Sequence, residues 1–270
     1  TTVNSFGDEW TKFDSFSDEE IALIGDEYFH IVSDKLPKKD WIALDVGCGT
    51  GRWTKFLSDK VKFIEAIDPS HAVHAAAQLL SDCDNVRITQ ATVDNLPFDD
   101  NSFDFIFSLG VLHHIPDTRR AMADAISKLK NNGTFLVYLY YSLDNRGVLF
   151  SSLFKLSNVI RNIVYRMPQN LKAVVCDIIA IIVYLPFVGT AKLFKSIFRK
   201  SEFWKKIPLS SYHNKSIGVI RNDALDRFGT PLEQRFSRNE IQSMMSSCGL
   251  KHIKFSEKAP FWVAAGIKSN

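Results

Sequence analysis

Short apolar runs alternate with amphipathic stretches through the first half of the chain. Five runs have the length of a strand: WIALDV, VKFIEAID, VRITQ, FDFIFSL and TFLVYLY. The segments between them, such as GRWTKFLSDK and TRRAMADAISKLK, have the spacing of helices. Apolar strands joined by helices are typical of a parallel sheet covered on both faces, with right-handed crossovers. This pattern predicts a doubly wound α/β core over residues 41–145.

The residues before this core predict a helical lid segment over residues 1–40. Ser17-Asp18-Glu19-Glu20 has the pattern of a capping box, and apolar residues follow it at helical spacing. An amphipathic helix is therefore expected here. Trp10 precedes this helix, and we expect it to contribute to a lid over the binding cleft.

Helix and strand patterns return near the C-terminus, over residues 221–270. Ser237-Arg238-Asn239-Glu240 is a second predicted capping box, and Gly249 ends the helix that it opens. KHIKFS and PFWVAAGIK then have the pattern of two strands around a short turn. The expected fold is therefore a mostly parallel, seven-stranded sheet with helices on both faces.

The alternation of strands and helices stops after Asn145. Residues 146–206 carry eleven basic residues and two acidic ones, a local net charge of +9. Apolar residues keep a helical period within this segment. We therefore predict a basic, apolar helical cap over residues 146–220, inserted after the fifth strand. Three interpretations of its charge stay open: a solvated surface, attraction of an anionic acceptor, and docking on an anionic membrane.

The longest stretch without Lys or Arg, residues 173–191, lies inside this cap. A membrane-spanning helix needs about 20 predominantly apolar residues. Asp177, Pro186 and Gly189 interrupt the stretch. A buried pair of helices is therefore the preferred interpretation, and contact with a membrane surface is the alternative.

Composition narrows the class of protein further. Of the 270 residues, 46% are hydrophobic and 23% are charged, which excludes disordered and collagen-like chains. The net charge of +3 is too small to indicate nucleic-acid or membrane binding by bulk charge, and we expect no nucleic-acid partner. Four widely spaced cysteines without a Cys-x-x-Cys pair predict neither a metal site nor a disulfide framework.

The first twenty residues are polar and acidic and lack the apolar core of a secretory signal. A cytoplasmic protein is therefore expected, with peripheral membrane contact through the cap as the alternative.

The most specific local motif is a strand that leads into three alternating glycines and then a helix. In ALDVGCGTG the glycines permit a sharp turn and let a ligand approach the backbone. Arg52 stands where the dinucleotide fingerprint Gly-x-Gly-x-x-Gly has its third glycine, which disfavours NAD. Asp68 closes the second strand 21 residues after Gly47, where a carboxylate can accept hydrogen bonds from ribose hydroxyls.

These residues resemble the class I S-adenosylmethionine-dependent methyltransferases, whose first motif is an acidic residue, an apolar residue and Gly-x-Gly-x-Gly. The resemblance covers residues 41–141 and resumes in the C-terminal helix and hairpin. It extends to LKNNG at 129–133, which matches the turn before the family's fifth strand. The resemblance implies that S-adenosyl-L-methionine is the cofactor and S-adenosyl-L-homocysteine the product.

The resemblance also implies a set of cofactor-binding residues. The family commonly has an acidic residue where this chain has Thr92, so adenine recognition rests on either the Val93 backbone or Asp94. The implied set is Asp45, Gly47, Cys48, Gly49, Gly51, Asp68, Pro69, Thr92, Val93, Asp94, Ser108 and Leu109.

Methyl transfer from a sulfonium requires alignment of donor and acceptor rather than a protein nucleophile. A general base is needed only when the acceptor is a hydroxyl or a protonated amine, and histidine suits that role near neutral pH. His113, after the fourth strand, and Tyr141, after the fifth, are the predicted catalytic residues. The predicted acceptor-binding residues are Trp10, Tyr140, Tyr212, His213 and Arg221.

The function expected from these features is methyl transfer from S-adenosylmethionine to oxygen or nitrogen of a small-molecule acceptor. Three alternatives stay open. They are a lipid-like or membrane-associated acceptor, a donor-binding module without catalytic activity, and a dinucleotide-dependent oxidoreductase.

Overall fold

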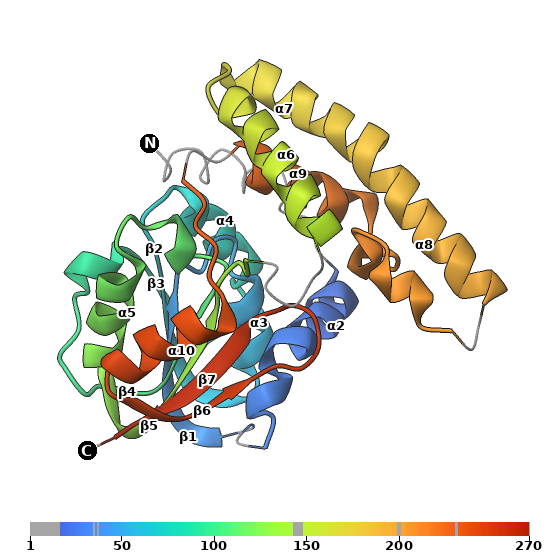
Figure 1. Cartoon of the computed structure of the whole chain (residues 1–270). Helices are drawn as coiled ribbons and strands as arrows, with labels where there is room; N and C mark the ends of the chain where they lie inside the picture. The colour runs from blue at the N-terminus through green and yellow to red at the C-terminus, as the bar shows by residue number, and fades with distance from the viewer. Residues whose placement is uncertain are drawn as a thin grey trace. The chain divides into compact units, whose positions relative to one another are not determined.

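The elements of the protein fall into two units in a computed structural model (Figure 1), which describes residues 17–34, 36, 38–142, 148–198, 201–229 and 232–269. The sheet unit consists of the described residues within 2–144 and 232–270. The helical unit consists of those within 145–231. The second unit is thus an insertion into the chain of the first.

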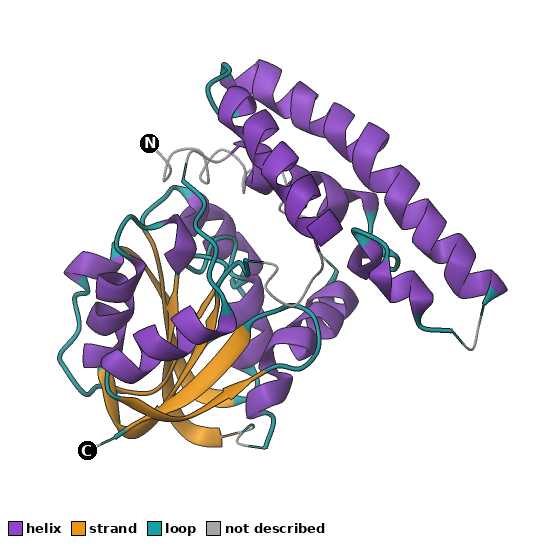
Figure 2. Cartoon of the chain, in the orientation of Figure 1, coloured by secondary structure: helices purple, strands orange, loops and turns teal. Residues whose placement is uncertain are grey.

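The sheet unit contains seven strands in the order β3-β2-β1-β4-β5-β7-β6. Strands β1 to β5 pair in parallel, whereas β7 is antiparallel to both β5 and β6. Figure 2 shows these strands as a single twisted sheet with helices on either side. The predicted doubly wound fold is therefore confirmed. The strands are β1 (Lys38–Val46), β2 (Val61–Asp68), β3 (Val86–Gln90), β4 (Phe103–Leu109), β5 (Leu129–Tyr138), β6 (Leu250–Phe255) and β7 (Val263–Lys268).

Two apolar layers cover the faces of this sheet. Neighbouring strand residues point to opposite faces, and Ala43 accordingly belongs to one buried cluster and Leu44 to the other. One layer includes side chains of α2 and α3, and the other includes side chains of α5 and α10. The helices of the unit are α2 (Asp18–Phe29), α3 (Arg52–Ser58), α4 (Ala72–Leu79), α5 (Thr118–Ser127) and α10 (Arg238–Ser247), with short 3-10 turns η1 (His30–Val32), η2 (Val93–Asn95) and η3 (Leu112–His114).

Local signals at the helix ends agree with the sequence. Ser17 Oγ accepts a hydrogen bond from the backbone N–H of Glu20 at 3.2 Å, and the carboxylate of Glu20 accepts one from the backbone N–H of Ser17. Ser237 and Glu240 form the same reciprocal pair at the start of α10. Gly249 has φ of +85° just beyond that helix. Both predicted capping boxes and the glycine stop are confirmed.

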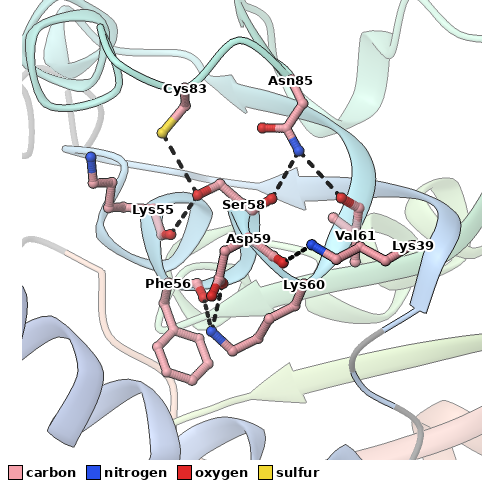
Figure 3. A network of polar contacts seen from close by, with 9 residues as sticks. All are labelled: Lys39, Lys55, Phe56, Ser58, Asp59, Lys60, Val61, Cys83 and Asn85. Atoms are coloured by element: carbon pink, nitrogen blue, oxygen red, sulfur yellow. Dashed lines mark hydrogen bonds and ion pairs between the residues drawn. The ribbon is translucent and has the colours of Figure 1, made fainter.

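A polar network ties the end of α3 to the amino ends of the strands (Figure 3). The side-chain amide of Asn85 donates to the carbonyl oxygens of Ser58 at 2.8 Å and Val61 at 3.3 Å. Lys39 donates to the carbonyl of Asp59, and Lys60 reaches the carbonyl of Phe56. This network fixes α3 at the edge of the sheet opposite the glycine loop.

The sequence LKNNG is not a turn before the fifth strand, as the resemblance suggested. Strand β5 begins at Leu129 and includes all five residues. Asn132 adopts φ of +63°, and the register of β4 against β5 shifts between Phe103 and Phe105. An asparagine tolerates this left-handed conformation, so the irregularity is absorbed within the strand instead of ending it.

The helical unit contains three long helical runs and two short turns. Helix α9 packs against α6 and α7, with Ile220, Ala224 and Phe228 buried. We predicted that the cap ends at residue 220, but this boundary cuts through α9, whose apolar residues repeat every four positions. The elements are α6 (Val148–Val164), α7 (Gln169–Ile179), the π-helical segment η4 (Ala180–Tyr184), α8 (Leu185–Ile197), η5 (Phe203–Lys206), η6 (Ser210–Tyr212) and α9 (Ile217–Gly229).

The expected pair of buried helices is instead one continuous helix, Gln169–Ile197, formed by α7, η4 and α8. A proline lacks a backbone donor and crowds the carbonyl four residues earlier. The wider π turn lies immediately before Pro186 and accommodates this crowding. Among the described residues, this helix alone is long and apolar enough, by length and composition, to cross a membrane, and 28% of its most apolar window is buried within the protein.

Candidate functional site

A tight glycine loop joins the carboxyl end of β1 to α3. Gly47 and Gly51 have φ of +83° and +85°, which side-chain-bearing residues rarely adopt. A Cβ on Gly47 would lie 2.5 Å from Val111, so the loop has no room for one. The backbone N–H groups of Gly47 and Cys48 both donate to the carbonyl of Ile67 at 2.8 Å. The loop is thereby held against the end of β2.

Asp68 connects the end of β2 to this loop. Its Oδ2 accepts a hydrogen bond from the backbone of Gly49 at 3.0 Å. Its Oδ1 accepts from the backbone and the hydroxyl of Ser70, at 2.9 and 2.6 Å. A carboxylate offers about four acceptor positions, so three protein donors leave room for one ligand hydroxyl. The sequence suggested that both ribose hydroxyls bind here, which would require Gly49 or Ser70 to release the carboxylate.

Asp45 lies near the carboxyl end of β1, two residues before Gly47, and is almost fully buried. Its Oδ2 accepts a hydrogen bond from the hydroxyl of Thr54 in α3 at 2.6 Å. Burial raises the pKa of Asp45 to about 7, against the lowering effect of Thr54 and with a further rise from the carboxylate of Asp68. A cationic ligand group near this carboxyl would favour its ionised form.

This raised pKa predicts a pH-dependent donor affinity. If Asp45 accepts the ligand's ammonium, as the resemblance implies, it must be ionised, so affinity for S-adenosylhomocysteine should rise as pH increases through about 7. One pH unit below that pKa, binding should be about tenfold weaker. Calorimetric titrations across this range measure the effect, with Asp45→Asn as the comparison. A wild-type affinity as flat with pH as that of Asp45→Asn would exclude this role.

Two further loop residues differ in what they can offer a ligand. Burial raises the pKa of the Cys48 thiol well above its usual range, with smaller contributions from Asp45 and Asp68, so the side chain stays neutral. Thr50 is 3% exposed, and its hydroxyl has no hydrogen-bond partner within the described residues. Thr50 carries no sequence signal of its own, because only the glycines of the motif are distinctive. Its buried hydroxyl is a donor available to a ligand.

The predicted adenine-side residues follow β3. The hydroxyl of Thr92 hydrogen-bonds the carboxylate of Asp94 and lowers its pKa. The side chain of Val93 packs in the core, so only its backbone could contact a ligand. The carbonyl of Pro69 accepts a hydrogen bond from the side chain of Gln90 at 3.0 Å. Both predicted sources of adenine recognition, the Val93 backbone and Asp94, therefore remain predictions.

The carboxyl end of β4 supplies two more of the predicted cofactor residues. Ser108 is fully buried, and its hydroxyl donates to the carbonyl of Val46 at 2.8 Å, which ties β4 to β1. Leu109 packs in the apolar layer that includes α2 and α3. Both side chains are thus committed to the fold, so a ligand could meet only their backbone.

His113, in the turn after β4, is fully buried in an aromatic cluster. Its ring stacks on Tyr140 with centroids 4.0 Å apart, and it lies equally close to the ring of His114. Neither ring nitrogen has a hydrogen-bond partner within the described part of the chain. Burial holds the pKa of His113 well below its usual range, and the charges of His114 and Arg235 act in the same direction. The imidazole is therefore neutral near pH 7.

A segment that the sequence analysis did not single out completes this cluster. Arg235 and Glu233 form an ion pair at 2.6 Å, with side chains 9% and 2% exposed. The guanidinium of Arg235 lies 5.3 Å from the ring centroid of Tyr140 and donates to the carbonyl of Tyr141. The segment is anchored by the backbone N–H of Gln234, which donates to the carbonyl of His113 at 3.1 Å. In the sequence, Glu233 and Arg235 look like charged residues of a solvated loop between two helices.

The two tyrosines after β5 lie on opposite sides of the chain. Tyr140 contacts His113, whereas Tyr141 packs against Phe261 and Trp262, with ring centroids 5.7 and 6.4 Å away. This alternation is that of an extended strand. The structure therefore brings His113 together with Tyr140, and not with the predicted catalytic Tyr141.

Three of the remaining predicted acceptor residues belong to the helical unit. Within the helical unit, Tyr212 donates to Asp223 at 2.5 Å, and Arg221 forms two hydrogen bonds with Asp177. His213 accepts from Lys195 at 2.7 Å. Trp10 lies outside the described residues. No group of three or more His, Cys, Asp or Glu side chains that could hold a metal occurs among the residues that the structure describes.

The fold and the loop together define the class of this protein. The 3-2-1-4-5-7-6 sheet order with an antiparallel β7 and the glycine loop closed by Asp68 are accompanied by a family match over residues 44–137, described as a methyltransferase domain. Residues 44–137 therefore form a methyltransferase domain, and the sheet unit has the fold of the class I S-adenosylmethionine-dependent methyltransferases.

Particular relatives agree with this assignment. The uncharacterized methyltransferase YcgJ of Bacillus subtilis is 28% identical over 130 residues, which are 47% of this chain and 51% of that protein. A demethylmenaquinone methyltransferase of Staphylococcus epidermidis is 33% identical over 108 residues, 38% of this chain and 45% of the relative. The chain thus spans about half the length of these curated relatives. The crystal structure of YcgJ superposes with a TM-score of 0.54 at 16% identity, covering 90% of this chain and 98% of that one, which supports the fold alone.

The residues around the loop fit the cofactor of this class. Gly47, Gly49 and Gly51 all have positive φ, and without side chains their backbone can be approached closely by a ligand. Asp68 is fixed with room for a sugar hydroxyl, and the buried hydroxyl of Thr50 lacks a protein partner. These are the contacts that a ribose and the polar end of S-adenosylmethionine would require.

Proposed function

We propose that this protein transfers a methyl group from S-adenosylmethionine to oxygen or nitrogen of a small-molecule acceptor. The observation that carries the proposal is the glycine loop held to Asp68 at the carboxyl edge of the sheet. Ligands of open α/β sheets bind at this edge. Asp45, Asp68 and Thr50 would hold the donor, with the backbone of the Gly47–Gly51 loop beneath it.

When bound, the cofactor supplies a methyl group already activated by a positively charged sulfur. The protein's residues then have to orient the acceptor and remove its proton. His113 is neutral because its pKa is lowered by burial, and both of its ring nitrogens lack protein partners. Tyr140 fixes the plane of the imidazole by stacking. We assign the general base to His113 and the role of a positioning residue to Tyr140 in place of Tyr141.

This assignment predicts that His113→Ala lowers kcat. A positioned general base contributes about 10²–10⁴-fold, so a loss within that range is expected. Because the pKa of His113 lies below its usual range, wild-type kcat should not fall as pH decreases to about 6.5, where an ordinary histidine is half protonated. Steady-state rates across pH measure both effects, with His74→Ala, an exposed histidine of α4, as the control. Unaltered turnover in His113→Ala at every pH would remove it as the base.

A lipid-like or membrane-associated acceptor is the second candidate. It is supported by the apolar side chains that the helical unit exposes, among them Ile182 at 67% and Ile163 at 59%. The names of the relatives do not decide between the two candidates. One is a demethylmenaquinone methyltransferase and another a tRNA U34 carboxymethyltransferase, so proteins that share this domain are named for chemically unlike acceptors.

A methyl-transfer screen tests the proposed function directly. The full chain would be incubated with a labelled donor and either aqueous metabolites or extracted lipids, and labelled products would be identified by mass. Label in an aqueous metabolite supports the small-molecule acceptor, and label confined to lipids supports the second candidate. Tight donor binding with no labelled product in either fraction would favour a donor-binding module without catalytic activity.

A further inference from the structure

Exposed apolar side chains are concentrated in the helical unit. Of the seventeen large hydrophobic residues that are exposed within the described chain, sixteen lie in this unit, and Leu23 of α2 is the exception. Scattered exposed apolar residues are ordinary on a protein surface, whereas a contiguous set marks an interaction surface. The distribution therefore distinguishes this unit from the sheet unit.

The long helix formed by α7, η4 and α8 presents two different apolar faces. One face is buried within the unit and consists of Cys176, Ala180, Tyr184, Val188 and Ala191. The outward face bears no charge: between Ala173 and Ala191 the exposed residues are Val174, Ile178, Ile181, Ile182, Val183, Pro186, Gly189 and Thr190. A solvated helix normally carries polar residues on that side. We call these eight residues the outward face.

Polar contacts hold this helix within its own unit. Asp177 accepts two hydrogen bonds from Arg221 of α9, at 2.7 and 2.8 Å. The hydroxyl of Tyr184 donates to Asp223 of the same helix at 2.7 Å. Insertion across a bilayer would carry these charged partners into hydrocarbon or break the contacts, and both are unfavourable. The helix can instead lie along an interface with only its outward face immersed.

A basic hollow lies at the C-terminal end of the same helix. Its volume is about 630 Å³, and it is lined by Lys192, Lys195, Ser196, Ser201, Glu202, Trp204 and Lys205. The ammonium of Lys195 lies 4.9 Å from the ring centroid of Trp204. Three lysines face one glutamate, which pairs with Lys205. Lysine beside tryptophan is the composition of a membrane interface, where the ring lies at headgroup depth and the ammonium meets phosphate.

The charge of the whole unit favours an anionic lipid surface over a second copy of the chain. Residues 145–231 hold fourteen basic and four acidic residues, a net charge of +10. A symmetric dimer through the outward face would place two such units against each other, and their positive charges would repel. An anionic bilayer offers both an apolar interior for the outward face and phosphates for the lysines.

We propose that the helical unit docks on anionic membranes, with the outward face in the headgroup–acyl boundary and the lysine hollow on lipid phosphates. This docking does not require that the proposed methyl transfer be correct. It would bring the enzyme to acceptors that partition into a membrane.

Vesicle flotation tests this proposal with the full chain. Vesicles of phosphatidylcholine, alone or mixed with phosphatidylglycerol, are the probes. The wild type should float with the mixed vesicles, and its binding should weaken with added salt because exposed charges are screened. Ile182→Glu should reduce vesicle binding by about tenfold or more, since it removes immersed apolar area and adds a charge that the lipid repels. Leu23→Glu makes a similar change in the sheet unit, at 53% exposure, and should bind as the wild type does.

The lysine hollow is tested by the double variant Lys192→Gln/Lys205→Gln. Each lysine near an anionic surface contributes about fivefold in binding, so a loss on the order of 25-fold is expected for the pair. The same substitutions at the exposed Lys62 and Lys251 of the sheet unit are the control. Far-ultraviolet circular dichroism shows that each variant is folded, and calorimetry of the wild type with S-adenosylhomocysteine judges the proposed function separately.

Three results would overturn the docking proposal. The first is a wild type that does not float with anionic vesicles. The second is an Ile182→Glu variant that floats as well as the wild type does. The third is vesicle binding that does not depend on lipid charge or salt concentration. Light scattering adds a fourth: a wild-type dimer that Ile182→Glu dissociates, without vesicle binding, would assign the outward face to a second copy of the chain.

Discussion

Arg235→Met is expected to lower the free energy of unfolding of the sheet unit by about 3–5 kcal/mol, the range for removing one partner of a buried ion pair. Glu233 is 2% exposed and would be left without its partner. The substitution also removes the guanidinium from the face of Tyr140 and its hydrogen bond to the carbonyl of Tyr141. The effect should therefore be large for a single change outside the strands.

Denaturant unfolding measures this loss, and two further variants identify its cause. The double variant Glu233→Gln/Arg235→Met leaves no uncompensated charge and should recover much of the stability. Arg120→Met removes a surface pair with Asp124, in which Arg120 is 77% exposed, and should change stability by less than about 1 kcal/mol. If Arg235→Met lowers the free energy of unfolding no more than Arg120→Met does, the pair of Glu233 and Arg235 is not essential to the stability of the fold.

The same double variant reports on the site. The positive charge of Arg235 contributes to the low pKa of His113. Removing that charge should move the pKa of the imidazole upward, toward its ordinary value, while burial keeps it below that value. Nuclear magnetic resonance of the histidine ring measures the shift. An unmoved pKa would mean that the charge of Arg235 does not contribute to the low pKa of His113.

The second large effect is expected for Asp68→Ala. The loss of a charged hydrogen-bond acceptor for a ligand hydroxyl weakens binding by about 1.5–3 kcal/mol, or roughly 10- to 150-fold in Kd. The substitution also frees the backbone of Gly49, which Asp68 holds at 3.0 Å, so the loop becomes less preorganised. Titration with S-adenosylhomocysteine measures the change.

Ser70→Ala is the matched control for this effect. It removes one hydroxyl that donates to Asp68 but leaves the carboxylate in place, so donor affinity should change little. A Kd for Asp68→Ala equal to that of Ser70→Ala would show that the carboxylate does not contact the donor.

The features of this molecule that could be predicted from its sequence are those that depend on neighbouring residues. The apolar runs predicted all seven strands, and the capping boxes placed the starts of α2 and α10, because these features depend on neighbouring residues. The glycine loop was equally local. A chain must turn at Gly47 and Gly51 whatever the rest of the fold does.

Features that depend on distant segments could not be read in this way. Glu233 and Arg235 are buried because residues 232–236 return to the His113 turn, more than a hundred positions away in sequence. Neighbouring residues of an extended strand point to opposite sides, as Tyr140 and Tyr141 do, but the local sequence does not show which side holds His113. The π turn before Pro186 has no sequence signature, so the helix appeared divided.

Parallel calorimetric titrations of the full chain with S-adenosylhomocysteine and with NAD test whether the glycine loop binds the methyl donor. The glycine loop and Asp68 predict saturable binding of one S-adenosylhomocysteine per chain and no binding of NAD. If NAD binds and S-adenosylhomocysteine does not, the glycine loop is not a site for the methyl donor.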